Sequence, residues 1–138
     1  MKLVVAFVFI AFTTCGQPSV VGKWTTVDDD TGKDRSIVEI VERNGVLTGR
    51  IVALIDPDRA NPVCDKCEKD DVRYNKPIIG MEIIQGMTRS GSEYGGGSIL
   101  DPEDGRTYRC KLWLEGPELM VRGYWGPFYR TQTWRKST

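Results

Sequence analysis

The stretch RSIVEIVERNGVLTGRIVALI, residues 35–55, decides the fold. Two segments rich in β-branched residues, 35–43 and 46–55, flank the pair Asn44-Gly45. Both residues of that pair tolerate a positive φ angle, and Asn-Gly between two such segments is the strongest short signal for a β-hairpin. The stretch therefore predicts two antiparallel strands joined by a two-residue turn.

The same pattern continues on both sides of this hairpin, with turn signals roughly every 8–12 residues, the spacing typical of all-β domains. Further strands are predicted at residues 21–27, 77–87, 93–100, 106–115, 118–125 and 130–136. The apolar segment 77–87 is also compatible with a helical turn, and no strong amphipathic helix is expected elsewhere. Because short connections pair consecutive strands and barrel closure removes exposed edges, we expect an all-β, antiparallel up-and-down β-barrel of about eight strands.

The first strand opens with Gly22-Lys23-Trp24, which resembles the Gly-x-Trp signature of the calycin barrels, the lipocalins and their relatives. The resemblance implies that Trp24 closes the barrel floor and that a basic residue of the last strand packs across its ring. Arg130 and Arg135 are the residues expected in this cation–π contact.

A second resemblance covers nearly the whole chain after residue 21. Its motifs in order are Gly22-x-Trp24, Thr31-Gly32-Lys33, Asn44-Gly45-x-Leu47, Cys64-x-x-Cys67, Lys76-Pro77-Ile78-Ile79-Gly80-Met81, Gly96-Gly97-x-Ile99-Leu100-Asp101-Pro102 and Arg130-Thr131-Gln132-Thr133-Trp134. In order and spacing they resemble domain-of-unknown-function family 2147, a family of exported bacterial proteins. The resemblance implies a calycin-like (lipocalin-like) barrel and implies no activity, since the family has no established one.

The N-terminal segment predicts a secretory signal peptide over residues 1–18, followed by the barrel domain at 19–138. Lys2 precedes an apolar run, Leu3–Phe12, that is shorter than the roughly 20 residues needed to span a bilayer. A buried core strand is the alternative. Cys15 is a candidate for the acylated cysteine of a lipoprotein, which would anchor the protein to a membrane; cleavage by the ordinary signal peptidase is the alternative. Either route places the domain in the periplasm or cell envelope.

The composition narrows the functional classes. The 138 residues fit one domain, and 19 basic residues balance 19 acidic ones, so no basic surface is expected to bind nucleic acid. The chain contains no histidine, which removes Ser-His-Asp and Cys-His catalysis and every histidine-ligated metal site. We therefore favour a binding protein over an enzyme and expect no catalytic residue and no cofactor.

The pair Cys64-x-x-Cys67 lies in a polar loop, residues 56–76. In an oxidising compartment we expect a local disulfide that orders this loop. A redox-active pair is an alternative, although it needs a low-pKa thiolate. A zinc site is disfavoured because it prefers four cysteine or histidine ligands. Cys110 falls on the apolar face of its strand and is expected to be a buried free thiol.

Two further segments carry weaker signals. The acidic stretch 28–34 suggests calcium, but its spacing does not match the helix-loop calcium motif, so a solvated hairpin loop is favoured. The run Gly95-Gly96-Gly97 fits a bulge or sharp bend better than a ligand-contact surface.

Five aromatic residues near the C-terminal end are the candidate ligand contacts: Trp113, Tyr124, Trp125, Phe128 and Tyr129. They fit either the core or the rim of the barrel mouth, where aromatic side chains suit ligand contact. The favoured function is a barrel that binds a small apolar or amphipathic molecule. The alternatives are an envelope interaction protein with a solid barrel, and a thiol–disulfide redox protein that uses Cys64 and Cys67.

Overall fold

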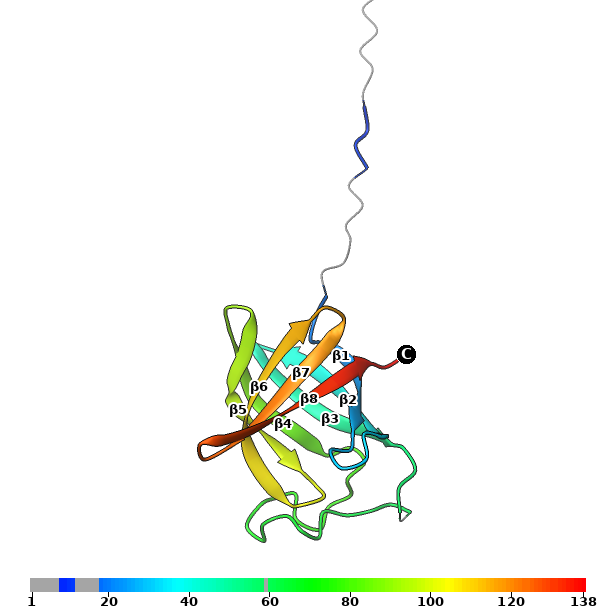
Figure 1. Ribbon diagram of the computed structural model, residues 1–138, viewed down its shortest axis with the longest axis vertical. Helices are drawn as coiled ribbons and strands as arrows, with labels where there is room; N and C mark the ends of the chain where they lie inside the picture. The colour runs from blue at the N-terminus through cyan, green and yellow to red at the C-terminus, as the bar shows by residue number, and fades with distance from the viewer. Residues whose placement is uncertain (1–7, 12–17, 59) are drawn as a thin grey trace, which may run out of the picture.

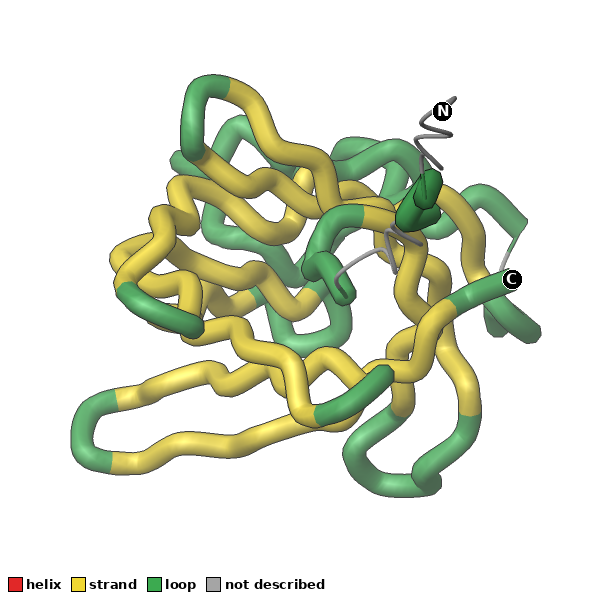
Figure 2. The backbone as a smooth tube through the Cα atoms, turned by 90° about the horizontal axis from the view of Figure 1, so that it is seen from above, coloured by secondary structure: helices red, strands yellow, loops and turns green. Residues whose placement is uncertain are grey.

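The computed structural model describes residues 8–11, 18–58 and 60–138, and all regular elements in these ranges are strands. They are β1 (Gly22–Val27), β2 (Asp34–Arg43), β3 (Val46–Leu54), β4 (Glu82–Ser90), β5 (Glu93–Asp101), β6 (Arg106–Glu115), β7 (Glu118–Trp125) and β8 (Phe128–Lys136). Within the apolar segment 77–87, residues 77–81 belong to the preceding loop, and the strand begins at Glu82. Figure 2 shows strands and loops and no helix in the part of the chain that the structure describes, which therefore offers no helical membrane span.

The eight strands form a closed antiparallel barrel in sequence order (Figure 1). Each strand pairs with the next, and β1 closes the barrel by pairing with β8 through Trp24 opposite Lys136 and Thr25 opposite Arg135. The all-β, up-and-down barrel predicted from the sequence is thus confirmed.

The hairpin that decides the fold has the predicted turn. Asn44 and Gly45 adopt φ angles of 52° and 78°, and the strands pair from Arg43 opposite Val46 onward. Buried and more exposed positions alternate along β2, so one face of the hairpin points into the barrel. The alternation explains why the sequence pattern alone could specify the register.

One half of the barrel interior is filled by apolar side chains, and we call it the floor half. Its members are at most 1% exposed: Trp24, Val38, Ile40, Leu47, Ile84, Met87, Leu112 and Leu119. The Trp24 indole N–H donates a hydrogen bond of 2.8 Å to the carbonyl oxygen of Val20, so the segment before β1 covers this end. Gly49 leaves room for Ile84, whose Cβ lies 2.9 Å from the point that a Cβ on residue 49 would occupy.

Lys136 provides the cation–π contact to Trp24, with its Nζ 4.8 Å from the ring centroid. The prediction that Arg130 or Arg135 fills this role is therefore wrong. Arg135 lies on the opposite face of β8 from Lys136 and pairs with Asp34, whereas Arg130 is six positions away at the other end of the strand. The motif needs a glycine at position 22 because Gly22 has a φ of 136°, a backbone conformation that other residues rarely adopt.

Candidate functional site: a cavity at the barrel mouth

The other half of the barrel holds a cavity of about 840 Å³. It opens at the end of the barrel where four connections meet, residues 28–33, 55–81, 102–105 and 126–127, and we call this end the mouth. None of the eight floor-half residues lines the cavity. The cavity therefore begins where the floor packing stops.

The cavity wall combines apolar and polar side chains that point inward from the strands. The apolar part includes Ile51, Ile83, Ile99, Val121 and Trp134, and the polar part includes Thr26, Ser36, Tyr108 and Gln132. The hydroxyl oxygens of Thr26 and Ser36 lie 2.7 Å apart in a buried hydrogen bond. Since these two hydroxyls hydrogen-bond to each other, apolar groups of a ligand can lie against them without leaving a buried hydroxyl unpaired.

A chain of hydrogen bonds links the wall to the rim. The Trp134 indole N–H donates to the Gln132 side-chain oxygen at 2.7 Å, and the Gln132 amide donates to Asp29 at 2.8 Å. Asp29 also pairs with Arg130 at 3.0 Å. This network fixes the rim side chains of β8 against the β1–β2 turn.

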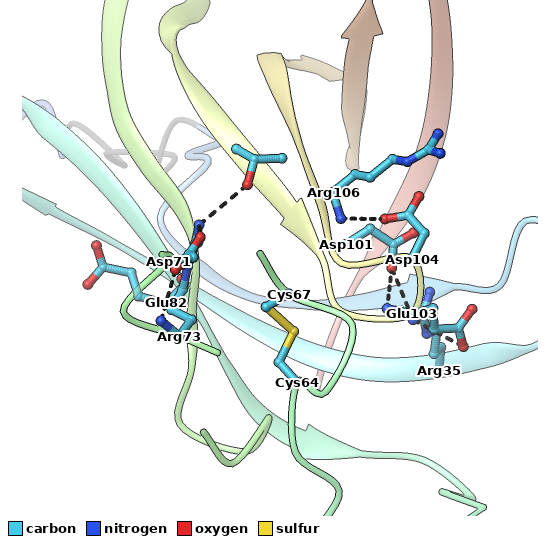
Figure 3. Close-up of a disulfide and its surroundings, with 11 residues drawn as sticks. Arg35, Cys64, Cys67, Asp71, Arg73, Glu82, Asp101, Glu103, Asp104 and Arg106 are labelled. Atoms are coloured by element: carbon cyan, nitrogen blue, oxygen red, sulfur yellow. Dashed lines mark hydrogen bonds and ion pairs between the residues drawn. A yellow bond between two sulfur atoms is a disulfide. The ribbon is translucent and has the colours of Figure 1, made fainter. Parts of the chain in front are cut away.

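Arg35 makes a second cross-link at the rim. Its guanidinium lies 3.3 Å from a carboxylate oxygen of Asp101 and 3.1 Å from one of Glu103 (Figure 3). Burial raises the pKa of Glu103, an effect that Arg35 opposes and that the nearby carboxylate of Asp101 reinforces. The rim is therefore charged and internally paired, whereas the wall below it is largely apolar.

Two titratable groups inside the barrel are held in their neutral forms. Burial, reinforced by the hydrogen bond from the hydroxyl to Asp104, raises the pKa of Tyr108 to about 12. Burial raises the pKa of the Cys110 thiol to about 12 as well, as expected of a buried free cysteine. Neither group is therefore anionic near neutral pH.

Cys64 and Cys67 form the predicted disulfide, with a sulfur–sulfur distance of 2.01 Å (Figure 3). The two residues are 0% and 4% exposed. Gly105 of the β5–β6 turn packs directly on this loop, because a Cβ there would lie 1.8 Å from the carbonyl oxygen of Lys66. The disulfide loop is thus docked beside the mouth, and its burial hinders attack by an external thiolate.

The acidic stretch 28–34 directs its carboxylates to separate partners. Asp28 accepts hydrogen bonds from the backbone amides of Asp30 and Thr31, whereas Asp29 pairs with Arg130 and Asp34 with Arg135. No group of three or more acidic or cysteine side chains in the described residues could hold a metal ion.

The glycine run accommodates a neighbouring strand. The pairing of β5 with β6 shifts register between Tyr94 and Gly97, and Gly96 has a φ of 76°. A Cβ on Gly97 would lie 2.1 Å from the carbonyl oxygen of Gln85 on β4. The run therefore forms an irregularity that lets β4 approach closely, in agreement with the bulge interpretation.

The structure separates the five predicted aromatic contacts. Trp125, Phe128 and Tyr129 border the mouth, and all three are largely exposed. Trp113 and Tyr124 are not part of the cavity lining, so their placement in one ligand-contact set with the others is corrected. They occupy the outer face of β6 and β7, where side chains alternate with the inward Leu112 and Val121.

Sequence reasoning missed the polar wall, above all Tyr108 and Gln132. The signal was present in the alternation: Tyr108 shares a face with Cys110 and Leu112, and Gln132 shares one with Trp134. A polar residue on the same strand face as core residues marks the height in the barrel at which apolar packing ends and the cavity begins.

A closed eight-stranded barrel with one packed end and one open end defines the lipocalin-like class. The solved structure of protein HP1028 from the human pathogen Helicobacter pylori, described as belonging to the lipocalin family, is similar to this chain with a TM-score of 0.75. The two are 21% identical, and the match covers 88% of this chain and 85% of that one, which shows a shared fold.

The family model described as "Uncharacterized protein conserved in bacteria (DUF2147)" matches residues 22–136, and the chain belongs to that family. The matched span contains all eight strands of the barrel. Comparison with curated protein sequences finds no match.

Proposed function

We propose that this chain is an exported binding protein whose barrel holds one small amphipathic molecule in the mouth cavity. The observation that carries the proposal is the cavity of about 840 Å³, with an apolar wall below a charged rim. Ligand sites in proteins typically enclose about 300–1,000 Å³ and combine apolar surface with a few placed polar groups. An eight-stranded barrel leaves room for packed side chains or one small ligand, and the mouth half of this barrel is not packed.

The amphipathic character follows from the two levels of the site. Apolar groups of a ligand would contact Ile51, Ile99 and Val121, where burial of each CH₂ contributes about 0.8 kcal/mol. A polar head would lie beside Gln132 and the paired charges of the rim. A solid interaction barrel is disfavoured by the cavity, and a thiol–disulfide enzyme by the burial of both disulfide residues.

Export is supported by the sequence and by the surroundings of the leader residues that the structure describes. Val8, Phe9 and Ile10 are 81%, 94% and 72% exposed and make no part of the barrel core. A structural disulfide also fits an oxidising compartment. Cys15 lies outside the described residues, so its acylation stays a prediction, which radiolabelled fatty acid incorporation into the wild type but not into Cys15→Ser would establish.

The test of binding is native mass spectrometry of the protein isolated from its own envelope, which should release a co-purifying small molecule on activation. The variant Ile99→Trp fills the cavity and should reduce retention at least about tenfold, since one well-filled apolar site contributes roughly 1.5–3 kcal/mol. Ile37→Trp is the matched control, because Ile37 alternates with the inward Ser36 and Val38 and so faces outward. Equal retention by the two variants, or no retained molecule in the wild type, would exclude a cavity ligand.

A further inference from the structure

The turn between β7 and β8 carries the largest exposed aromatic cluster of the barrel. Trp125, Phe128 and Tyr129 are 63%, 68% and 61% exposed, and we call these three residues the aromatic tip. The connecting Gly126-Pro127 begins with a φ of 56° at Gly126, the glycine-first arrangement of type II′ hairpin turns. In Figure 1 this turn reaches past the neighbouring strands at the left, and Figure 2 shows a hairpin projecting on the same side.

The exposure of the aromatic tip is costly in water and is not a general property of the fold. Trp24 and Trp134 are 1% and 2% exposed, so the barrel does bury large aromatic side chains where they serve packing. At the tip, the ring centroids of Trp125 and Phe128 lie 6.5 Å apart, which holds the two rings together as one apolar surface. Contiguous exposed apolar surface of this kind marks an interaction site.

Cations surround the tip. The Arg106 guanidinium lies 5.5 Å from the Trp125 ring, and that of Arg122 lies 4.3 Å from the Tyr129 ring. The Arg109 guanidinium lies 5.7 Å from the ring of Tyr124, whose centroid lies 5.9 Å from that of the tilted Tyr129 ring. In the described part of the chain, none of these three arginines forms an ion pair.

The carboxylates at the rim have partners of their own. Asp29 pairs with Arg130, Asp101 and Glu103 share Arg35, and Asp104 accepts a hydrogen bond from the Tyr108 hydroxyl. The tip is therefore an apolar knob beside three guanidinium groups that form no ion pair among the described residues.

We propose that the aromatic tip is a membrane-contact site that inserts into the interface of a bilayer containing anionic lipids. Tryptophan and tyrosine prefer the headgroup level of a bilayer, where an apolar ring and a polar edge are both satisfied. Arginine binds phosphate in a bidentate manner, and each basic residue near an anionic surface contributes about a fivefold gain in binding. A projecting knob can enter a soft bilayer without the matching recess that a folded protein partner would need.

Bilayer contact by the tip does not require the cavity to be filled. The two sites share residues, however: Trp125, Phe128 and Tyr129 belong to the cavity lining as well as to the tip. Contact of the tip with a bilayer would bring the mouth to the lipid surface, from which an amphipathic molecule could pass into the barrel.

The experiment uses the barrel domain, residues 19–138, in every variant, so that neither the apolar leader nor an acyl chain contributes; this span contains all eight strands. Vesicles of phosphatidylglycerol and phosphatidylethanolamine should bind the protein, and pure phosphatidylcholine vesicles should bind it several-fold less well. Brominated acyl chains should quench the fluorescence of Trp125, and Trp125→Phe should remove most of that quenching. Of the other three tryptophans, Trp24 and Trp134 are buried, and Trp113 lies opposite Met120, five positions along β7 from Trp125. An absence of quenching on bound vesicles would overturn insertion of the tip.

Matched variants distinguish binding through the aromatic tip from non-specific binding of vesicles to exposed apolar residues. Phe128→Ser with Tyr129→Ser should weaken vesicle binding at least about tenfold through lost apolar insertion. Arg106→Gln with Arg109→Gln should weaken binding to the anionic vesicles by a similar factor and leave binding to phosphatidylcholine unchanged. Val72→Ser is the control, because Val72 is 85% exposed and lies on the loop between β3 and β4.

Circular dichroism and the midpoint of urea unfolding confirm that each variant is folded. The proposal fails if Val72→Ser weakens binding as much as the tip variant does, or if no variant changes it. Photocrosslinks from residue 128 that reach a protein and never a lipid in intact envelopes would also reject the bilayer in favour of a protein partner.

Discussion

The two halves of the barrel are made by the same strands and differ in what fills them. On β6 the inward positions run from the fully buried Leu112 to the cavity-lining Tyr108. On β8 they run from Lys136, which packs on Trp24, to the cavity-lining Trp134, Gln132 and Arg130. A step of two residues along a strand keeps the face and changes the height in the barrel. The packed core and the cavity are thus divided by height and not by strand.

The ends of the barrel are also closed differently. At the floor, tight turns such as Asn44-Gly45 join the strands, and Val20 covers Trp24. At the mouth, the long connection 55–81 is held by a disulfide, by the Gly105 contact and by an ion pair. The floor depends on apolar packing, whereas the mouth depends on a few specific links, and substitutions at the two ends should therefore behave differently.

The largest effect is expected at the floor. Trp24→Ala should lower the free energy of unfolding by about 3–5 kcal/mol, as removal of a fully buried large aromatic side chain does. Urea unfolding at constant m-value measures it. Ile99→Ala at the cavity wall is the comparison, and its cost should be clearly smaller because Ile99 already faces open space. Equal costs at the two sites would show that the mouth half is as tightly packed as the floor half.

The second effect tests the docking of the disulfide loop. Gly105→Ala should destabilise the protein by about 1–3 kcal/mol, because residue 105 has a φ of 73° and a Cβ there would collide with the Lys66 backbone. Gly116→Ala is the control: its φ is 57°, but nothing lies within 4 Å of its Cβ position. The excess cost at Gly105 measures the close approach, and costs of equal size would leave only the φ angle as their cause.

The strands, the hairpin turn and the disulfide could be predicted from the sequence because each depends on local signals. Alternation sets the face of every residue, and Asn44-Gly45 sets the turn. Lys136 as the partner of Trp24 was missed because the first and last strands meet only on closure, and one position of register decides which basic residue faces the ring. The cavity was not predictable in extent, since its volume depends on how the mouth loop packs against the open end of the barrel.

The third effect concerns the covalent link at the mouth. The double variant Cys64→Ala with Cys67→Ala should fold, and its free energy of unfolding should fall by about 2 kcal/mol. The loss is modest because closing a loop of so few residues removes little entropy from the unfolded chain. Limited proteolysis should cut the 56–76 segment faster in the variant, and the barrel strands should stay protected. Loss of the whole fold would mean that the link is needed beyond the mouth.

The smallest effect comes from the ion pair between Asp71 and Arg73 within the mouth loop. Arg73 donates to both carboxylate oxygens of Asp71, at 2.9 and 2.8 Å, and also donates to the backbone carbonyl of Glu82 at 3.0 Å. The hydrogen bond from Arg73 holds the pKa of Asp71 below 3.8, against the opposing effect of burial. Asp71→Asn should therefore cost about 0.5–1 kcal/mol near neutral pH.

The pH dependence gives this last prediction its sign. A carboxyl group whose pKa is lower in the folded state stabilises the protein fully above its unfolded pKa of 3.8, and the stabilisation is lost as the pH falls through the lower folded value. The difference in unfolding free energy between wild type and Asp71→Asn should be constant from neutral pH to about pH 5 and should shrink toward about pH 2. Asp70→Asn is the control, since Asp70 is exposed and forms no ion pair in the described part of the chain. A difference that persists unchanged in acid would assign the role of Asp71 to its shape and backbone hydrogen bonds, because only the ionised form draws stability from Arg73.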